Sequence, residues 1–536
     1  MSRSKNDLCA RILKDLYGEL PYKIGKYLMA KGACPLRLIT TDTKIPHNSV
    51  KRALWVLSHQ NIVHFEQNKK SFIEYGISCD RILWHVRYPK YIYCAKTLYG
   101  DAAELMVEEL LQGGQGLMSG VVSKVTERLN EALEASGHPK INMSLVKDKF
   151  SSLVRTHFLH RSLEPVKDDN NRVISLQSPQ NREELFQTPL ETEGPKRKRS
   201  VDDHSNPTKK LKTEGGEKEV PFDDGLYWQV NFDRFHQHFR DQAIIDAVCN
   251  KIDKKAGEIV RTMLRLSEVR TEQTAPVTMP MSINEISQSL PKDQGMTLRV
   301  VEQYLSIIAD DSCDFVSKVG DSGGGMYVVN IFKSLTALCK AHIESVVQER
   351  FGSKCVRLFR VLLLKKHVEQ KQIEECAMIP AKEAKDLLYT MFAENFVSIT
   401  EISKTPDHAP SRTFYLFKVD IDQVARMLLE RCYKALANSM MRREMEVADH
   451  KRLLDKQERV EAIIASLEQE GGEAAQKEEI EQMITPPERA QLDKVKKTVN
   501  MLDSCEVQLD NTIFLLETYL EYTKIPLPVL KKKQAF

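Results

Sequence analysis

Features that would mark a membrane, secreted or nucleotide-binding protein are missing from this 536-residue sequence. No stretch approaches the ~20 apolar residues of a membrane-spanning helix. The N-terminal segment MSRSKNDLCARILKDLYGEL carries charges throughout and lacks the apolar centre of a signal peptide. No GxxxxGK(S/T) phosphate-binding loop is present. We therefore expect a protein of the cytosol or the nucleus.

The cysteines and histidines lack the spacing of a metal site or of a disulfide framework. No two cysteines have CxxC spacing, and their number, eleven, is odd. His236 and His238 resemble a pair of metal ligands, but no third ligand with compatible spacing is visible. We predict neither a metal nor another cofactor, and we expect the cysteines to be reduced packing residues.

Charge is nearly balanced, with 78 Lys and Arg against 75 Asp and Glu, a net charge of +3 and a pI of about 8.1. This is not the overall charge of a protein whose main task is binding nucleic acid, so any DNA binding is expected to be local or shared with partners. The length and the apolar fraction of 42% indicate a globular protein of several domains.

Large apolar residues become sparse between residues 163 and 220, which predicts a disordered linker. Two basic clusters in it are candidate nuclear localisation signals, although such charge runs also simply keep a linker soluble. Ser200, beside the first cluster, is a candidate phosphorylation site. The clusters comprise Lys196, Arg197, Lys198 and Arg199, and then Lys209, Lys210 and Lys212.

A pattern of three helices followed by a strand pair recurs in the remaining sequence. In its first occurrence, helical stretches cover residues 22–31, ending near Gly32, and residues 36–43. Asn48 or Ser49 can cap a third helix, and strands at 62–66 and 72–75 flank a polar turn. The third helix has a predicted buried face of Val50, Ala53, Leu54 and Leu57. Three helices and a hairpin are typical of a winged helix.

Three further copies are predicted from the pattern alone, at about residues 102–163, 240–332 and 345–420. In the first copy, Lys51 and Arg52 point away from the buried face, and Lys69 and Lys70 lie in the wing turn. These four are candidate contacts to DNA phosphates. The alternative is that the module docks on protein and that its basic residues only keep the face solvated.

Two long helices are predicted after residue 420. Leu453, Val460 and Leu467 recur by sevens in the first, and breaks at residues 471–472 and 486–487 separate it from the second. In the second helix a 3–4 stripe is interrupted at Glu506; its members are Leu492, Val495, Val499, Leu502, Leu509, Ile513, Leu516 and Leu520. The pattern indicates an antiparallel coiled-coil hairpin with a docking role.

The predicted fold is thus mainly α with small β wings: four tandem winged helices and a C-terminal antiparallel coiled-coil hairpin. The predicted domains are 1–86 (first winged helix), 87–162 (second), 163–220 (linker), 221–335 (third), 336–420 (fourth), 421–523 (hairpin) and 524–536 (basic tail).

One segment imitates a catalytic motif. Residues 320–324, GDSGG, resemble the segment around the nucleophilic serine of chymotrypsin-like proteases, which makes Ser322 the single candidate nucleophile. That mechanism needs a histidine base oriented by a carboxylate, on a fold of two β-barrels. The upstream histidine motif is missing, Gly325 stands where those proteases have Pro, and the sequence pattern is mainly helical. A glycine-rich turn between two wing strands explains the segment better, so we predict no catalytic residue.

Several long segments resemble one family closely: residues 87–93 (RYPKYIY), 223–244, 320–330, 344–355 and 374–417. They are similar to the winged-helix and coiled-coil protein of eukaryotic RNA polymerase III that is known as its C-three subunit, in a vertebrate-like form. The resemblance covers nearly the whole chain outside the linker. The related large subunit of general factor IIE carries a zinc ribbon, and the absence of CxxC pairs favours the polymerase subunit.

The resemblance implies a non-catalytic, nuclear subunit with four extended winged helices. It implies a subcomplex with two other polymerase III-specific subunits on the clamp, recruitment to initiation factor IIIB, and help in opening promoter DNA for transfer RNA, 5S ribosomal RNA and other small RNAs. In vertebrates the polymerase is also linked to sensing AT-rich cytosolic DNA, an antiviral function. The alternatives are a stand-alone winged-helix or factor IIE-like DNA-binding factor, and an enzyme acting through Ser322.

Overall fold

The computed structural model describes residues 2–68, 72–167, 173–177, 184–188, 223, 225–268, 270–272, 274–291, 295–404, 406, 413–469 and 483–525. The chain forms two compact units, residues 9–236 and residues 1–8 with 237–536. Helices dominate, and the sheets are small and antiparallel, so the predicted fold class is confirmed. Among the described residues, no helix combines the length and apolar character needed to cross a membrane.

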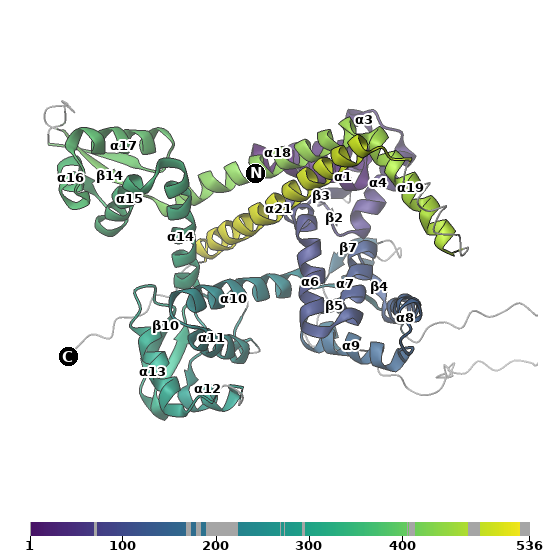
Figure 1. The fold of residues 1–536 in the computed structure, drawn as a ribbon, viewed down its shortest axis with the longest axis horizontal. Coiled ribbons are helices and arrows are strands. Elements are labelled where there is room, and N and C mark those ends of the chain that lie inside the picture. The colour runs from purple at the N-terminus through teal and green to yellow at the C-terminus, as the bar shows by residue number, and fades with distance from the viewer. Residues whose placement is uncertain are drawn as a thin grey trace, which may run out of the picture. The chain divides into compact units, whose positions relative to one another are not determined.

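Four modules share one plan: a leading helix, three further helices and a three-stranded sheet (Figure 1). In the first module the helices are α1 (Arg3–Tyr17), α2 (Glu19–Lys31), α3 (Leu36–Thr43) and α4 (His47–His59). Its sheet has the order β1-β3-β2, formed by Cys34–Pro35, Ile73–Ile77 and Val63–Gln67. The predicted buried face of α4 is confirmed, because Val50, Ala53, Leu54 and Leu57 are all buried.

The start of α4 differs from the prediction. Pro46, not Asn48 or Ser49, is the N-cap residue, and the helix begins at His47. The pyrrolidine ring of Pro46 holds φ at −55° and ψ is 137°, so the chain enters the helix from an extended residue. Gly32 does end α2 as predicted, with a φ of 85°.

The second module closes its sheet with a strand from beyond the linker. Its helices are α5 (Cys79–Leu83), η1 (Trp84–Arg87), α6 (Tyr88–Tyr99), α7 (Asp101–Gly113), α8 (Met118–Ala135) and α9 (Met143–Arg155). Strand β8 (Tyr227–Val230) lies between β4 (Gly116–Leu117) and β5 (Leu159–Arg161). The predicted boundary at residue 162 is therefore wrong, since β8 belongs to this module and not to the third.

Side chains confirm that the segment after the linker is part of the second module. Trp228 of β8 is fully buried, with its ring edge-on to Phe150 at 5.6 Å. Asp223 is also fully buried, and its carboxylate accepts hydrogen bonds from the backbone N–H and the hydroxyl of Ser119. Ser119 lies in the first turn of α8, where the helix dipole favours an anion.

The predicted disorder of residues 163–220 is wrong at its N-terminal end. There β6 (Glu164–Lys167) and β7 (Val173–Gln177) pair as an antiparallel hairpin, and β7 lies beside β2 of the first module. Val166, Val173 and Leu176 supply β-favouring apolar side chains that the overall composition of the segment concealed. A short 3-10 turn, η2 (Glu184–Phe186), follows. Residues 189–222 lie outside the described residues.

The third and fourth modules follow the same plan. The third consists of α10 (Phe232–Lys251), α11 (Lys254–Ser267), α12 (Ile283–Ser289) and α13 (Leu298–Ala309), with the sheet order β10-β11-β9 (Val316–Gly320, Met326–Val329, Met281–Ser282). The fourth consists of α14 (Ile331–Phe351), α15 (Ser353–Lys365), α16 (Gln370–Ala377) and α17 (Ala381–Ala393), with the order β12-β14-β13 (Val368–Glu369, Thr413–Lys418, Ser398–Ser403).

One backbone feature recurs in all four modules. After the third helix, a residue other than glycine adopts a left-handed conformation just before the next strand: Asn61 (φ 55°), His157 (65°), Asp314 (53°) and Asn395 (64°). Asn, Asp and His tolerate this region better than most residues. Each residue turns the chain sharply from helix to wing, which sets the angle between the two.

The first and fourth modules correspond without a gap. Helices α2 and α15 each have 13 residues, α3 and α16 each have 8, and α4 and α17 each have 13. The connections are equally long, so residues 18–63 align one to one with 352–397. Lys51 and Trp55 correspond to Lys385 and Tyr389. The sequence pattern predicted both copies but did not reveal that they align without a gap.

The C-terminal hairpin consists of α18 (Ile421–Asp449), α19 (Lys451–Gln469) and α21 (Pro486–Thr523). Helices α18 and α21 lie side by side (Figure 1). A break at His450, which the sequence did not predict, separates α18 from α19. Glu506 is buried in the predicted stripe and lies 3.0 Å from Arg443 of α18. An ion pair at a seam position favours one register of the two helices.

The end of α21 completes two cores. Leu515 and Tyr522 pack in the core of the third module, whereas Leu516 and Tyr519 pack in that of the fourth. Arg240 of α10 is buried and donates to the Tyr522 hydroxyl at 2.5 Å. This end of the hairpin thus packs within its own chain, and the docking role on other subunits stays a prediction.

Candidate interaction surfaces

The exposed face of α4 combines positive charge with an aromatic stack. Lys51 and Arg52 are exposed, as predicted, and their side chains point away from the buried stripe of the helix. Trp55 is 68% exposed, and the His59 ring stacks on it at 5.5 Å with an interplanar angle of 8°. Residues three and four apart share one face of a helix, so these four side chains form a continuous surface.

The sequence analysis missed Trp55 and His59. The buried stripe of the helix consists of Val50, Ala53, Leu54 and Leu57, and Trp55 falls outside it. Its position relative to that stripe was the one signal in the sequence that the ring is exposed. An exposed tryptophan beside two cations is unusual on a protein surface, because Trp is highly buried on average. It marks this face as a candidate binding surface.

The third helices of the third and fourth modules present different chemistry. In the fourth module, Asp386 stands at the position of Arg52, beside Lys385, and Tyr389 and Phe392 are 46% and 41% exposed. In the third, α13 exposes Glu302 and Ile307. Balanced charge and exposed apolar side chains suit a protein partner better than a phosphate backbone. The face of α4 is the more favourable one for DNA.

Several predicted site residues lie outside the described residues. They are the wing-turn candidates Lys69 and Lys70, all members of both basic clusters (Lys196, Arg197, Lys198, Arg199, Lys209, Lys210 and Lys212), and Ser200. Their roles stay predictions.

Ser322 lies where the wing interpretation places it. It opens η4 (Ser322–Gly324), the turn between β10 and β11. Gly324 and Gly325 have φ values of 86° and 123°, which explains the run of glycines. Asp321 forms an ion pair with Lys318 at 2.5 Å, and this lysine lowers the pKa of the Asp321 carboxyl. The carboxylate is thus engaged within the wing.

His236 belongs to an aromatic cluster. The Tyr91 hydroxyl lies 2.7 Å from its Nε2 atom, and the Trp84 ring contacts it edge-on at 4.9 Å. Burial, and then the charges of Arg87 and Arg81, lower the pKa of His236 to about 3. The neutral imidazole and the Tyr91 hydroxyl share this hydrogen bond, whose direction depends on which ring nitrogen carries the proton. Among the described residues, no group of three His, Cys, Asp or Glu side chains could hold a metal ion.

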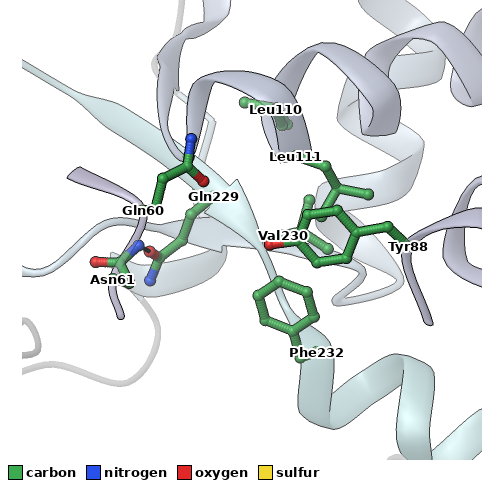
Figure 2. A pocket seen from close by; sticks show the side chains of 9 residues that line it. Gln60, Asn61, Tyr88, Leu110, Leu111, Gln229, Val230 and Phe232 are labelled. Atoms are coloured by element: carbon green, nitrogen blue, oxygen red, sulfur yellow. Dashed lines mark hydrogen bonds between the residues drawn. The ribbon is translucent and has the colours of Figure 1, made fainter. Parts of the chain in front are cut away.

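A small cavity lies between the first and second modules (Figure 2). Its lining includes Gln60, Asn61, Tyr88, Gln229 and Phe232. The volume is about 10 Å³, room for at most one water molecule, and far below the ~300 Å³ of a ligand pocket. This cavity therefore marks a contact between modules rather than a substrate site.

The fold defines a protein built of winged-helix modules and a C-terminal helical hairpin. Four family models match the chain: the RNA polymerase III subunit RPC82 helix-turn-helix domain (residues 7–68), RNA polymerase III subunit RPC82 (148–338), the POLR3C C-terminal winged-helix domain (343–419) and the helical hairpin domain of DNA-directed RNA polymerase III subunit RPC3 (452–515).

Full-length relatives give the same result. DNA-directed RNA polymerase III subunit RPC3 of Rattus norvegicus and that of Homo sapiens are each 50% identical, and that of Danio rerio is 45% identical; in each case the match covers 98% of this chain and 99% of the relative. The chain belongs to the family of RPC3 subunits of DNA-directed RNA polymerase III. It is a subunit of the transcription machinery and not the catalytic one.

Proposed function

We propose that this subunit acts in the nucleus during initiation by RNA polymerase III and helps to open promoter DNA. The observation that carries the proposal is the α4 face, where Lys51 and Arg52 border the exposed Trp55 ring. Two cations can neutralise phosphates, and a flat aromatic ring can stack on a nucleobase. A base becomes free to stack on a side chain once the duplex opens.

The other parts of the proposed role follow the family resemblance. They are membership of a subcomplex with two other polymerase III-specific subunits, recruitment to initiation factor IIIB, and synthesis of transfer RNA, 5S ribosomal RNA and other small RNAs. Sensing of AT-rich cytosolic DNA by the assembled polymerase belongs to the same proposal. The exposed apolar side chains of the fourth module, including Tyr389 and Phe392, support docking on protein.

Charge reversal at Lys51 and Arg52 tests the DNA contact. We expect the Lys51→Glu/Arg52→Glu variant, assembled into the polymerase, to lower open-complex formation on promoter DNA, measured by permanganate reactivity of unpaired thymines. The slope of log DNA affinity against log salt concentration should become shallower by the amount expected for the loss of about two phosphate contacts. Trp55→Ala should weaken binding by about 1–3 kcal/mol.

The fourth module offers a matched control. Lys385→Glu changes the charge at the position equivalent to Lys51, on a face that we do not assign to DNA. It should leave open-complex formation unchanged. Normal opening by the Lys51→Glu/Arg52→Glu polymerase, with the subunit fully incorporated, would refute the DNA contact.

A second candidate is an additional role of the free chain as a separate DNA-binding factor, and the basic face of α4 favours this role over an enzymatic one. Purification from nuclear extract distinguishes this role from that of the subunit. The proposed function predicts that the polymerase core and two further subunits are recovered with this chain. Recovery of the free chain, bound tightly to duplex DNA, would favour the separate role.

A further inference from the structure

The loop that ends α4 in the first module is held by the second module. The Gln60 side-chain amide donates to the Gln112 carbonyl at 2.7 Å, and the Asn61 amide donates to Oε1 of Gln229 at 2.9 Å. Figure 2 shows Asn61 beside Gln229, which comes from β8. Both amides follow directly after the α4 helix, so they fix its C-terminal end.

The hydrogen bond to Gln229 continues into the second module. The Gln229 amide nitrogen lies 3.4 Å from Nε2 of His160, and Nδ1 of His160 lies 2.7 Å from the Arg161 carbonyl oxygen. Burial lowers the pKa of His160, so the ring is neutral and carries its proton on Nδ1, where it donates to the carbonyl. Nε2 then accepts from Gln229, whose oxygen faces Asn61. Asn61 thus donates to Gln229, Gln229 donates to His160, and His160 donates to the Arg161 carbonyl.

Gly114 permits a close backbone approach at the same place. It follows α7 with a φ of 74°, and a Cβ atom on it would lie 2.4 Å from the carbonyl oxygen of His59. A backbone oxygen cannot move aside as a flexible side chain can. Any larger residue at position 114 must therefore push α4 away from α7.

Apolar contacts fill the space around these polar groups. Leu110, Leu111 and Val230 line the cavity together with Tyr88 and Phe232 (Figure 2). The cavity itself holds at most one water molecule, so the side chains around it pack closely. Strand β7, in the hairpin that follows the second module, also lies beside β2 of the first.

We propose that the first and second modules form one rigid body, locked by Asn61, Gly114 and Gln229, so that the α4 face keeps a fixed orientation relative to the second module. The two modules therefore meet a partner as one composite surface. The lock stands on contacts within residues 9–236, and it holds whether or not α4 contacts DNA.

Distances between spin labels test the lock directly. Nitroxides on genetically encoded p-acetylphenylalanine at the exposed positions Thr41 and Glu131 report the separation of α3 and α8 in the full chain without disturbing the native cysteines. Pulsed electron paramagnetic resonance should give one narrow distribution of label-to-label distances for the parent chain. Gly114→Ala should broaden or shift it.

Gly32→Ala is the matched control for this variant. Gly32 follows α2 with a φ of 85°, at the same place in the first module, but a Cβ atom there would meet nothing within 4 Å. Both substitutions force alanine into a left-handed conformation, and Gly114→Ala alone drives it into the other module. The Gly32→Ala chain should keep the narrow distribution.

A second pair of variants removes the hydrogen bond without straining the backbone. Asn61→Gly keeps the left-handed residue and deletes the amide, and Asn395→Gly makes the same change in the fourth module. Hydrogen exchange in the peptide around residue 61 should rise about tenfold in Asn61→Gly, because the hydrogen bond to Gln229 is lost and leaves a partly buried acceptor without its donor. Asn395→Gly should leave that peptide unchanged.

Two results would overturn the proposal. The first is a broad distance distribution in the parent chain, which would show that the modules move independently. The second is an equal response to Gly114→Ala and Gly32→Ala, which would show that the close approach to His59 does not hold the modules together.

Discussion

Acidification should open the unit formed by residues 9–236, and His236 should account for a large share of the effect. The pKa of His236 is about 3 in the folded chain, mainly because the ring is buried, against an ordinary value of 6.5. Between these values the unfolded chain binds a proton that the folded chain excludes. The free energy of unfolding therefore falls as the pH drops below 6.5. Above that value His236 is neutral in both states and costs the folded chain no stability.

The size of the effect follows from the two pKa values. At pH 5 the His236 ring is mostly protonated in the unfolded chain and neutral in the folded chain, which costs about 2 kcal/mol of unfolding free energy. His85 and His160 add to the slope, because burial lowers their pKa values too. Protonation would also place a positive charge on the ring near Arg87.

Hydrogen exchange of the α6 peptide at pH 7 and pH 5, corrected for the intrinsic rate, measures this loss locally in a chain of several modules. His236→Gln offers the Tyr91 hydroxyl both a donor and an acceptor, and it should remove about 2 kcal/mol of the pH dependence. His138→Gln, at an exposed histidine, is the control and should change nothing. An unchanged pH dependence in His236→Gln would show that this histidine is not held neutral in the fold.

Three further predictions concern packing and connectivity. Arg443→Met should lower the opening free energy of the hairpin, measured by hydrogen exchange of the α21 amides, by about 2 kcal/mol. The double variant Arg443→Met/Glu506→Leu should recover most of this loss, and an equal loss in both variants would argue against a buried pair. Gly257→Ala places a Cβ atom 2.0 Å from the Cys249 sulfur and should lower thermal stability by about 1–3 kcal/mol, whereas Gly120→Ala, in open space, should not; similar melting of the two would contradict the close packing. Cleavage at a protease site introduced within residues 189–222 should leave the two fragments together on gel filtration, since β8 pairs with β4 and β5, and separation would mean that this sheet is not stable.

Local patterns predicted the third helices well. The stripe in α4 and the wing of the third module depend on residues close in sequence, and both lie where predicted. The leading helices α1, α6, α10 and α14 were not assigned. Helix α14 has buried residues spread along its length, from Ile331 to Val347, and contacts both α15 and α21, so its environment is set by distant parts of the chain.

The pairing of β8 could not be predicted from local patterns either. Residues 227–230 follow a long polar segment and lie next to the start of α10, so proximity in sequence favours the third module. The assignment to the second module comes from the buried ring of Trp228 and the two hydrogen bonds of Asp223, which are contacts with residues about a hundred positions earlier. Similarly, the exposure of Trp55 follows from helix geometry, but its stacking on His59 needs the three-dimensional structure.

The late position of β8 also governs how the protein is made. A ribosome extends a chain by about 5–20 residues per second, so β8 emerges several seconds after β5. Until then β4 and β5 lack the strand that joins them, and the site for the Trp228 ring beside Phe150 is open. A nascent chain paused between residues 163 and 222 would expose this apolar site and two unpaired strand edges to chaperones or to neighbouring chains.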